Sequence, residues 1–148
     1  MKLVFRKSIN SLDSICEITS CMHALFKPET VLLIDGDLGA GKTTFVTYLL
    51  NEKGYENISS PTYALHNSYS HKDNQNHFLK IEHVDLYRLN TSDDIESTGF
   101  WDLFLNKNSL IIIEWAERIN NNLWPLNWNQ YYLKIFKQDD QYLYELYN

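Results

Sequence analysis

The chain has 148 residues, enough to bury a core without cross-links, and we expect residues 1–148 to form a single domain. Its formal net charge of −6 argues against a protein that binds its partner mainly through the phosphate backbone of a nucleic acid, so any contact with RNA is expected to be indirect. No segment approaches the roughly 18 apolar residues of a membrane span, so we expect a cytoplasmic protein without membrane attachment.

The N-terminal part predicts a short strand over residues 2–6 and a helix over about residues 12–25, which ends before Pro28. Cys16 and Cys21 lie on this helix without a C-x-x-C pattern or a nearby histidine ligand. We therefore expect reduced thiols that are buried or half-buried.

A phosphate-binding motif follows. Residues 36–43, Gly-Asp-Leu-Gly-Ala-Gly-Lys-Thr, match G-x-x-x-x-G-K-[S/T], between an apolar segment at 30–34 that predicts a buried strand and a helical pattern that ends at Gly54. Glycines let backbone N–H groups curl around phosphates, and the helix N-terminus adds partial positive charge. The motif predicts binding of a nucleoside triphosphate, with Lys42 at the β- and γ-phosphates and the Thr43 hydroxyl on Mg²⁺. The residues expected to bind the nucleotide are Asp37, Leu38, Gly39, Ala40, Gly41, Lys42, Thr43 and Thr44.

The middle of the chain predicts two strands, at 63–69 and 78–84, joined by a polar hairpin loop at 70–77. A helix is expected over residues 93–104.

The last third predicts a central strand at 110–113, because four consecutive apolar residues show none of the alternation of a half-exposed strand. Two further strands, at 131–136 and 142–147, are expected on either side of a turn at 138–141.

Two carboxylates stand at predicted strand ends. Glu114 follows the central strand, the position of a Walker B acid, and is expected to bind Mg²⁺ together with Thr43. Asp85 follows the strand at 78–84. In parallel α/β sheets, ligand-binding and catalytic residues lie at the C-terminal ends of the strands, although this argument is weaker if the strand is antiparallel. A helix cap or a partner for Arg88 is the alternative for Asp85.

For three other kinds of residue, the sequence does not decide between a functional and a structural role. Thr62 follows Pro61 and is either a switch residue that senses the γ-phosphate or part of an ordinary turn. Trp115 is able to stack on a base or contact a partner, but a core position is its default interpretation. The histidines at 66, 71, 77 and 83 lack metal-ligand spacing and are interpreted as surface or structural residues.

Four blocks in series resemble one known family, the TsaE (YjeE) family, in order and spacing. The blocks are Gly36-Asp37-Leu38-Gly39-Ala40-Gly41-Lys42-Thr43-Thr44, Ser60-Pro61-Thr62-Tyr63, His83-Val84-Asp85-Leu86-Tyr87-Arg88-Leu89 and Ile113-Glu114-Trp115. The resemblance covers residues 30 to 120, whereas a phosphate loop alone occurs in many unrelated proteins.

The resemblance implies a Mg²⁺-dependent P-loop ATPase that acts with the TsaD and TsaB proteins to make threonylcarbamoyladenosine in transfer RNA. Such a subunit is expected to be a monomer alone and slow until its partners bind. The implied fold is an α/β, P-loop NTPase-like domain with a mostly parallel central sheet, flanking helices and antiparallel terminal strands.

Carried over residue by residue, the resemblance makes Lys42 the phosphate lysine, with Thr43 and Glu114 as Mg²⁺ ligands. It makes Thr62 the switch threonine and Asp85 an acid important for hydrolysis. The family's N-terminal stretch near the adenine is only loosely matched by residues 8–14, and its C-terminal basic position has no clear counterpart, since no Lys or Arg follows Lys137.

Two other functions use the same loop. A small-molecule kinase has the same Mg²⁺ site but usually needs several arginines around its acceptor, and this chain has only Arg6, Arg88 and Arg118. A nucleotide-gated binding module with negligible turnover would use the bound state to select a partner surface.

Overall fold

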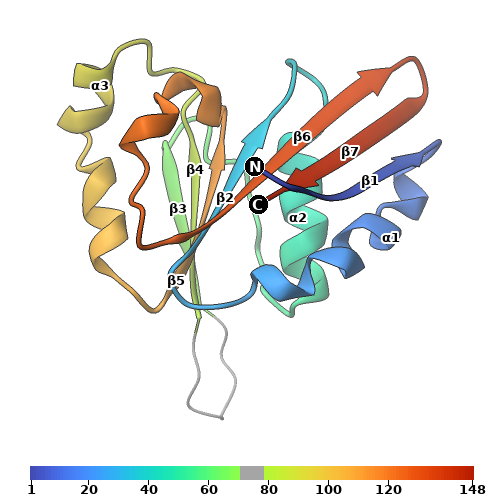
Figure 1. The fold of residues 1–148 in the computed structure, drawn as a ribbon, viewed down its shortest axis with the longest axis horizontal. Coiled ribbons are helices and arrows are strands. Elements are labelled where there is room, and N and C mark those ends of the chain that lie inside the picture. Colours follow the sequence, from blue (N-terminus) through green and yellow to red (C-terminus); the bar gives the residue numbers. More distant parts are fainter. Residues whose placement is uncertain (71–78) are drawn as a thin grey trace.

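A computed structural model describes residues 1–70 and 79–148 and shows a seven-stranded sheet in the order β1-β7-β6-β2-β5-β4-β3 (Figure 1). The strands are β1 Leu3–Ile9, β2 Thr30–Asp35, β3 His66–Tyr69, β4 Lys80–Asp85, β5 Ser109–Glu114, β6 Asn129–Gln138 and β7 Gln141–Tyr147. The α-helices are α1 Cys16–Thr19, α2 Lys42–Glu52 and α3 Ser92–Ser97, and the 3₁₀ helices are η1 Leu12–Ser14, η2 Ser20–Leu25, η3 Phe100–Leu105, η4 Ala116–Arg118 and η5 Asn121–Leu123.

The sheet is mixed, so the expectation of a mostly parallel sheet is only partly correct. β2 pairs in parallel with β5 and β6, and β4 pairs in parallel with β5. The other pairings, β1 with β7, β6 with β7 and β3 with β4, are antiparallel. The parallel strands are central because helices cover both of their faces, whereas antiparallel neighbours extend the sheet on each side.

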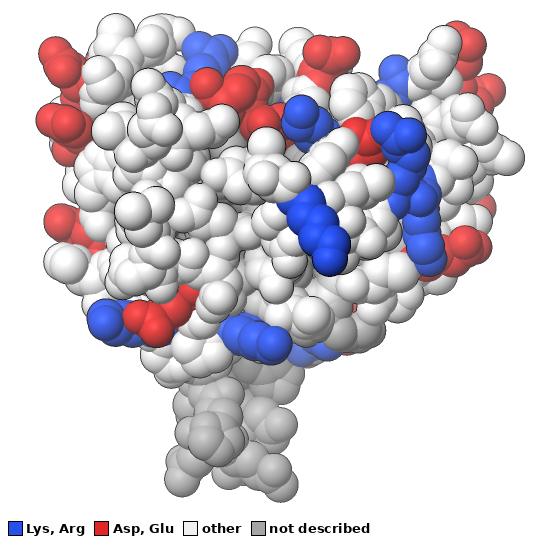
Figure 2. Space-filling view, viewed as in Figure 1, with Lys and Arg blue, Asp and Glu red and all other residues white. Residues whose placement is uncertain are grey.

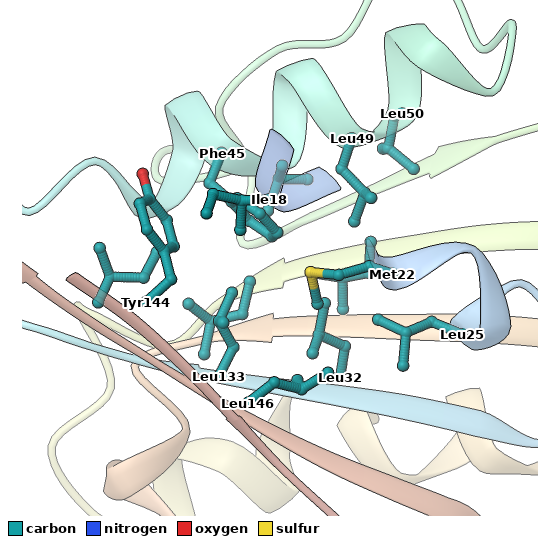
Figure 3. Packing of buried hydrophobic residues seen from close by; sticks show 14 of the residues in the cluster. Ile18, Met22, Leu25, Leu32, Phe45, Leu49, Leu50, Leu133, Tyr144 and Leu146 are labelled. Atoms are coloured by element: carbon teal, nitrogen blue, oxygen red, sulfur yellow. The ribbon is translucent and has the colours of Figure 1, made fainter. Parts of the chain in front are cut away.

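Two hydrophobic layers enclose the central strands. On one face, α1, η2 and α2 pack against side chains such as Leu32 and Leu133, and Figure 3 shows Met22 and Leu49 within this layer. Each fully buried side chain of this size stabilises the fold by about 1.5–3 kcal/mol relative to an exposed one. The phosphate loop is therefore attached to a helix that is fixed along one side of the sheet.

The opposite layer contains α3 and η3 and is rich in aromatic rings. Trp124 and Trp128 pack with Phe104, whose ring centroid lies 5.0 Å from that of Trp128, and Trp101 lies 5.9 Å from Trp124. This aromatic cluster covers the sheet next to residues such as Val31. It contains three of the four tryptophans of the chain.

The strands β6, β7 and β1 extend beyond this aromatic layer (Figure 1). In the same view, several Lys and Arg side chains lie over this part of the sheet, and acidic side chains lie along both the α3 side and the opposite edge (Figure 2).

The helix predicted over residues 12–25 is broken into η1, α1 and η2. The reason lies in side chains that return hydrogen bonds to the preceding turn: Thr19 Oγ1 donates to the Ile15 and Cys16 carbonyls, and Ser20 Oγ donates to the Glu17 carbonyl. Such bonds compete with the regular helical ladder. Cys21 Sγ makes the same kind of bond at 3.2 Å.

The helix predicted over 93–104 is also interrupted. Gly99 adopts φ 72° between α3 and η3, a left-handed conformation that ends the first helix. The strand predicted over 63–69 begins only at His66, because residues 62–64 form a turn and Leu65 has φ 67°.

The remaining strands form close to their predicted positions. β1 extends to Ile9 instead of residue 6, β4 spans Lys80–Asp85, β6 is longer at both ends, and β7 begins one residue earlier. The loop predicted at 70–77 lies outside the described residues except for Ser70. Cys16 and Cys21 are both exposed, so the expectation of buried thiols was wrong. None of the helices in the described part of the chain is long and apolar enough to cross a membrane.

Candidate functional site

The phosphate loop connects β2 to α2 and is shaped by glycines. Gly36 has φ 156°, and Gly39 and Gly41 have φ 80° and 93°. Gly41 is the N-cap of α2 and has no side chain to bond the first N–H groups of the helix. These N–H groups are directed out of the helix end, where an anion is favoured by both hydrogen bonding and the helix dipole. The loop geometry therefore suits a phosphate.

The Lys42 side chain curls back over this loop. Its Nζ donates to the carbonyl oxygens of Gly36 at 2.6 Å and Asp37 at 3.0 Å, and it lies 3.7 Å from the centroid of the Trp115 ring. Only 5% of Lys42 is exposed. Burial lowers the pKa of Lys42 below its ordinary value, while the nearby carboxylates, Glu114 first, oppose this change.

Thr43 and Glu114 meet across the site. Thr43 Oγ1 donates to Glu114 Oε2 at 2.9 Å, which joins the start of α2 to the end of β5. The Glu114 residue is only 2% exposed. A hydroxyl and a carboxylate in contact supply the hard oxygen atoms that Mg²⁺ prefers.

Thr62 and Asp85 form a second contact. Thr62 Oγ1 donates to Asp85 Oδ2 at 2.5 Å, and the backbone N–H of Tyr87 donates to Asp85 Oδ1 at 2.9 Å. The sequence argument that places Asp85 in the site is stronger for a strand that is parallel to the central strand. β4 does run parallel to β5, so Asp85 lies at the same edge of the sheet as Glu114. The Arg88 guanidinium stacks 4.3 Å from the Tyr63 ring centroid.

These residues surround one open cavity of about 320 Å³ beside the phosphate loop. The cavity forms because the ends of β2, β4 and β5 meet at the same edge of the sheet, and Asp85 and Glu114 are directly paired in register. Its lining includes most of the predicted nucleotide-binding residues, but Asp37 and Ala40 are outside it. The lining residues are Leu38, Gly39, Gly41, Lys42, Thr43, Thr44, Thr62, Asp85, Tyr87, Glu114 and Trp115.

The donor set fits a magnesium ion that arrives with a phosphate ligand. Within residues 1–70 and 79–148, no three His, Cys, Asp or Glu side chains are grouped so that they could hold a metal ion by themselves. Mg²⁺ often takes only one or two carboxylates from the protein and completes its shell with phosphate oxygens and water. Thr43 and Glu114 meet that requirement.

Sequence reasoning missed the contact of His83 with this site. His83 is fully buried, and its Nε2 lies 2.8 Å from Glu114 Oε1. The signal was available in the sequence, because His83 is two residues before Asp85 and therefore faces the same side of the strand. Trp115 was assigned to the core by default, but it also lines the cavity and contacts Lys42.

Asp35 and Glu117 add further acidic groups near Lys42. The Glu117 backbone N–H donates to Asp35 Oδ1 at 3.1 Å. Desolvation, together with the neighbouring Asp35 carboxylate, raises the pKa of Glu117 from 4.5 to about 7.

The fold and the loop define the class of this protein: an α/β domain with a P-loop between a central parallel strand and the helix that follows it. Within that class, residues 9–143 match the family described as "Threonylcarbamoyl adenosine biosynthesis protein TsaE". The chain therefore belongs to the TsaE family.

Several curated relatives support this membership, and each is called a tRNA threonylcarbamoyladenosine biosynthesis protein TsaE. The protein from Rickettsia conorii is 37% identical over 120 residues, which covers 80% of this chain and 65% of the relative. The Haemophilus influenzae protein is 39% identical, covering 60% of this chain and 52% of the relative, and the Bacillus subtilis protein is 35% identical, covering 72% and 63%. The aligned part of this chain thus spans less than two thirds of each of these relatives.

A solved structure supports the fold. The crystal structure of YdiB from Bacillus subtilis is similar with a TM-score of 0.70, covering 99% of this chain and 86% of that chain. The sequence identity is 22%, so this likeness concerns the fold alone.

Proposed function

We propose that this protein is a Mg²⁺-dependent ATPase of the machinery that makes threonylcarbamoyladenosine in transfer RNA, acting with TsaD and TsaB. The observation that carries the proposal is the meeting of Lys42, Thr43, Thr62, Asp85 and Glu114 around one cavity at the phosphate loop. Family membership supplies the pathway, since the relatives are named for the biosynthesis of this modified nucleoside.

In the proposed mechanism, the loop from Leu38 to Thr43 holds the phosphates, and Lys42 turns from the loop carbonyls to the β- and γ-phosphates. Thr43 and Glu114 would hold Mg²⁺. The ion, when bound, neutralises charge on the phosphate oxygens. Asp85 and Thr62 are placed together to orient a water molecule for attack, with Asp85 as the hydrogen-bond acceptor.

The test is the steady-state ATPase rate of the purified protein, alone and with matching TsaB and TsaD. We expect a low rate alone that rises when the partners are added. Lys42→Ala should reduce the stimulated rate by about 10²–10³-fold, because a cation aimed at the phosphates is removed. Lys107→Ala is the matched control, since Lys107 is exposed and its ammonium group pairs with Glu29 at the surface.

Other outcomes lead to other functions. A high rate without partners would indicate a self-sufficient enzyme, and no turnover under either condition would indicate a nucleotide-gated binding module. Normal turnover by the Lys42→Ala protein would contradict the proposed site.

A further inference from the structure

The buried histidine behind the proposed metal site has a function of its own. We infer that His83 is a positioning residue for Glu114: its ring N–H fixes one carboxylate oxygen so that the other faces Thr43 and the cation. The inference rests on the proposed function and adds to it a residue that lies behind the cavity and is not among its lining residues.

The two oxygens of Glu114 have different partners. Oε1 lies 2.8 Å from His83 Nε2, and Oε2 accepts a hydrogen bond from Thr43 Oγ1 at 2.9 Å. The carboxylate is therefore held from β4 on one side and from α2 on the other. Its plane and its direction are both set before a ligand binds.

The sheet brings these partners together. His83 pairs in register with Ile112, and Asp85 pairs with Glu114, so His83 lies one pleat below the strand ends on the face covered by α2. His83 is 0% exposed and Glu114 is 2% exposed. At this depth no solvent competes for Glu114 Oε1, which leaves the histidine as its fixed donor.

The ring itself indicates which nitrogen carries the hydrogen. His83 Nδ1 is buried and has no hydrogen-bond partner among the described residues. An N–H at Nδ1 would be a buried donor without an acceptor, whereas an N–H at Nε2 is satisfied by Glu114 Oε1. The structure thus assigns the donor to Nε2. A ligand carboxylate that is hydrogen-bonded by a second residue is a common arrangement in metal sites.

A second His–Glu contact, between a half-buried histidine and a buried glutamate, provides a control. His66 Nε2 lies 2.5 Å from Glu82 Oε2, between β3 and β4, and neither residue lines the nucleotide cavity. Loss of that pair tests what a His–Glu contact away from the cavity contributes to stability. Loss of the His83 contact tests the effect on the metal ion.

The experiment compares His83→Gln with His83→Asn. Both side chains end in the same amide, but only the longer glutamine is able to place its N–H near the position of Nε2. Calorimetry measures the Kd of ATP in excess Mg²⁺ and in EDTA for the native protein, both variants and His66→Asn. Thermal unfolding of each protein confirms that it is folded.

We expect His83→Asn to weaken ATP binding in Mg²⁺ by about 10–100-fold, the usual effect of removing the partner of a metal ligand, and to leave binding in EDTA unchanged. His83→Gln should restore most of the Mg²⁺ effect. His66→Asn should lower the unfolding temperature without changing the ratio of the two Kd values.

Each contrary result identifies what is wrong. Equal ratios of the two Kd values in the native, Asn and Gln proteins would overturn the inference and leave the proposed function standing. The inference also fails if the Asn and Gln variants lose the Mg²⁺ effect equally, because the donor would then not be the feature that matters. A native protein that binds no ATP would overturn the proposed function together with the inference.

Discussion

At the scale of single residues, the reactive groups are held by partners before any ligand arrives. Asp85 shows this clearly, because one oxygen accepts the Thr62 hydroxyl and the other accepts the Tyr87 backbone N–H. In the proposed ATPase, such preorganisation of Asp85 would reduce the rearrangement needed in the transition state. The pairing also makes the effects of Thr62 and Asp85 interdependent.

We predict that Asp85→Asn slows ATP turnover in the presence of the partner proteins while ATP still binds. Thr62→Ala should slow turnover too, and the double variant should lose less than the sum of the two effects, with a coupling of about 0.5–3 kcal/mol, because both substitutions disturb the same hydrogen-bonded pair. The measurements are kcat with partners and the Kd of Mg-ATP. Asp93→Asn, on the exposed side of α3, is the control.

Strictly additive effects would contradict the coupling between Thr62 and Asp85. Loss of ATP binding by a folded Asp85→Asn protein would instead make Asp85 a direct ligand of the metal ion.

At the scale of secondary-structure elements, the phosphate loop rests directly on β6. A Cβ added at Gly36 would lie 2.5 Å from the carbonyl oxygen of Ile135, which is a backbone atom in the neighbouring strand. A Cβ at Gly39 would have no heavy atom within 4 Å. The two glycines are therefore needed for different reasons, close approach at Gly36 and positive φ at Gly39.

We predict that Gly36→Ala destabilises the fold by about 1–3 kcal/mol, since β6 cannot move away without disturbing its own pairing. Gly39→Ala should cost only the strain of its left-handed backbone conformation, φ 80°, which is about 1–2 kcal/mol and less than the loss at Gly36. Chemical unfolding monitored by circular dichroism measures both. Equal losses would show that the contact with Ile135 does not limit the loop.

Some elements were predictable from the sequence and others were not. Apolar, β-branched runs identified β2 and β5, because a strand covered on both faces needs no polar alternation. The broken helix around Thr19 was missed because side-chain bonds to the preceding turn depend on geometry that composition does not reveal. The spacing of His83 and Asp85 indicated that both face the same side of their strand, but the contact of His83 with Glu114 depends on which strands are neighbours.

At the scale of the whole molecule, the sheet divides into a parallel centre that carries the site and antiparallel strands at both sides. The sequence predicted the class of fold and the site edge, since the loop motif and the carboxylates mark the ends of β2, β4 and β5. It overstated the parallel part, because the pairing of β1 with β7 joins the two ends of the described chain, and local patterns carry no information about such a distant contact.

A buried charge near the edge strand β3 makes overall stability depend on pH. Burial of Glu82 would raise its pKa, but hydrogen bonds from His66, Lys80 and Ser68 outweigh burial and lower the pKa from 4.5 to about 2. The unfolded chain therefore binds more protons between these values. The stabilisation is complete above pH 4.5 and is lost as the pH falls toward 2.

We predict that Glu82→Gln lowers the free energy of unfolding near pH 7 by about 3 kcal/mol, the size of a shift from 4.5 to about 2. The difference from the native protein should shrink as the pH falls toward 2. Urea unfolding at several pH values measures it, with Glu96→Gln on α3 as the control. A difference that stays constant with pH would contradict the assignment.

The aromatic cluster opposite α2 has a consequence for optical measurements. Trp101, Trp124 and Trp128 are packed together in that layer, whereas Trp115 lies apart from them, against Lys42 at the cavity beside the phosphate loop. The intrinsic tryptophan fluorescence of the chain therefore has two sources. One is the aromatic layer, whose emission depends on folding, and the other is Trp115, whose emission depends on the surroundings of the cavity. In a Trp115→Phe variant the remaining tryptophan emission would follow unfolding alone. Subtracting the spectrum of this variant from the native spectrum would give the emission of Trp115.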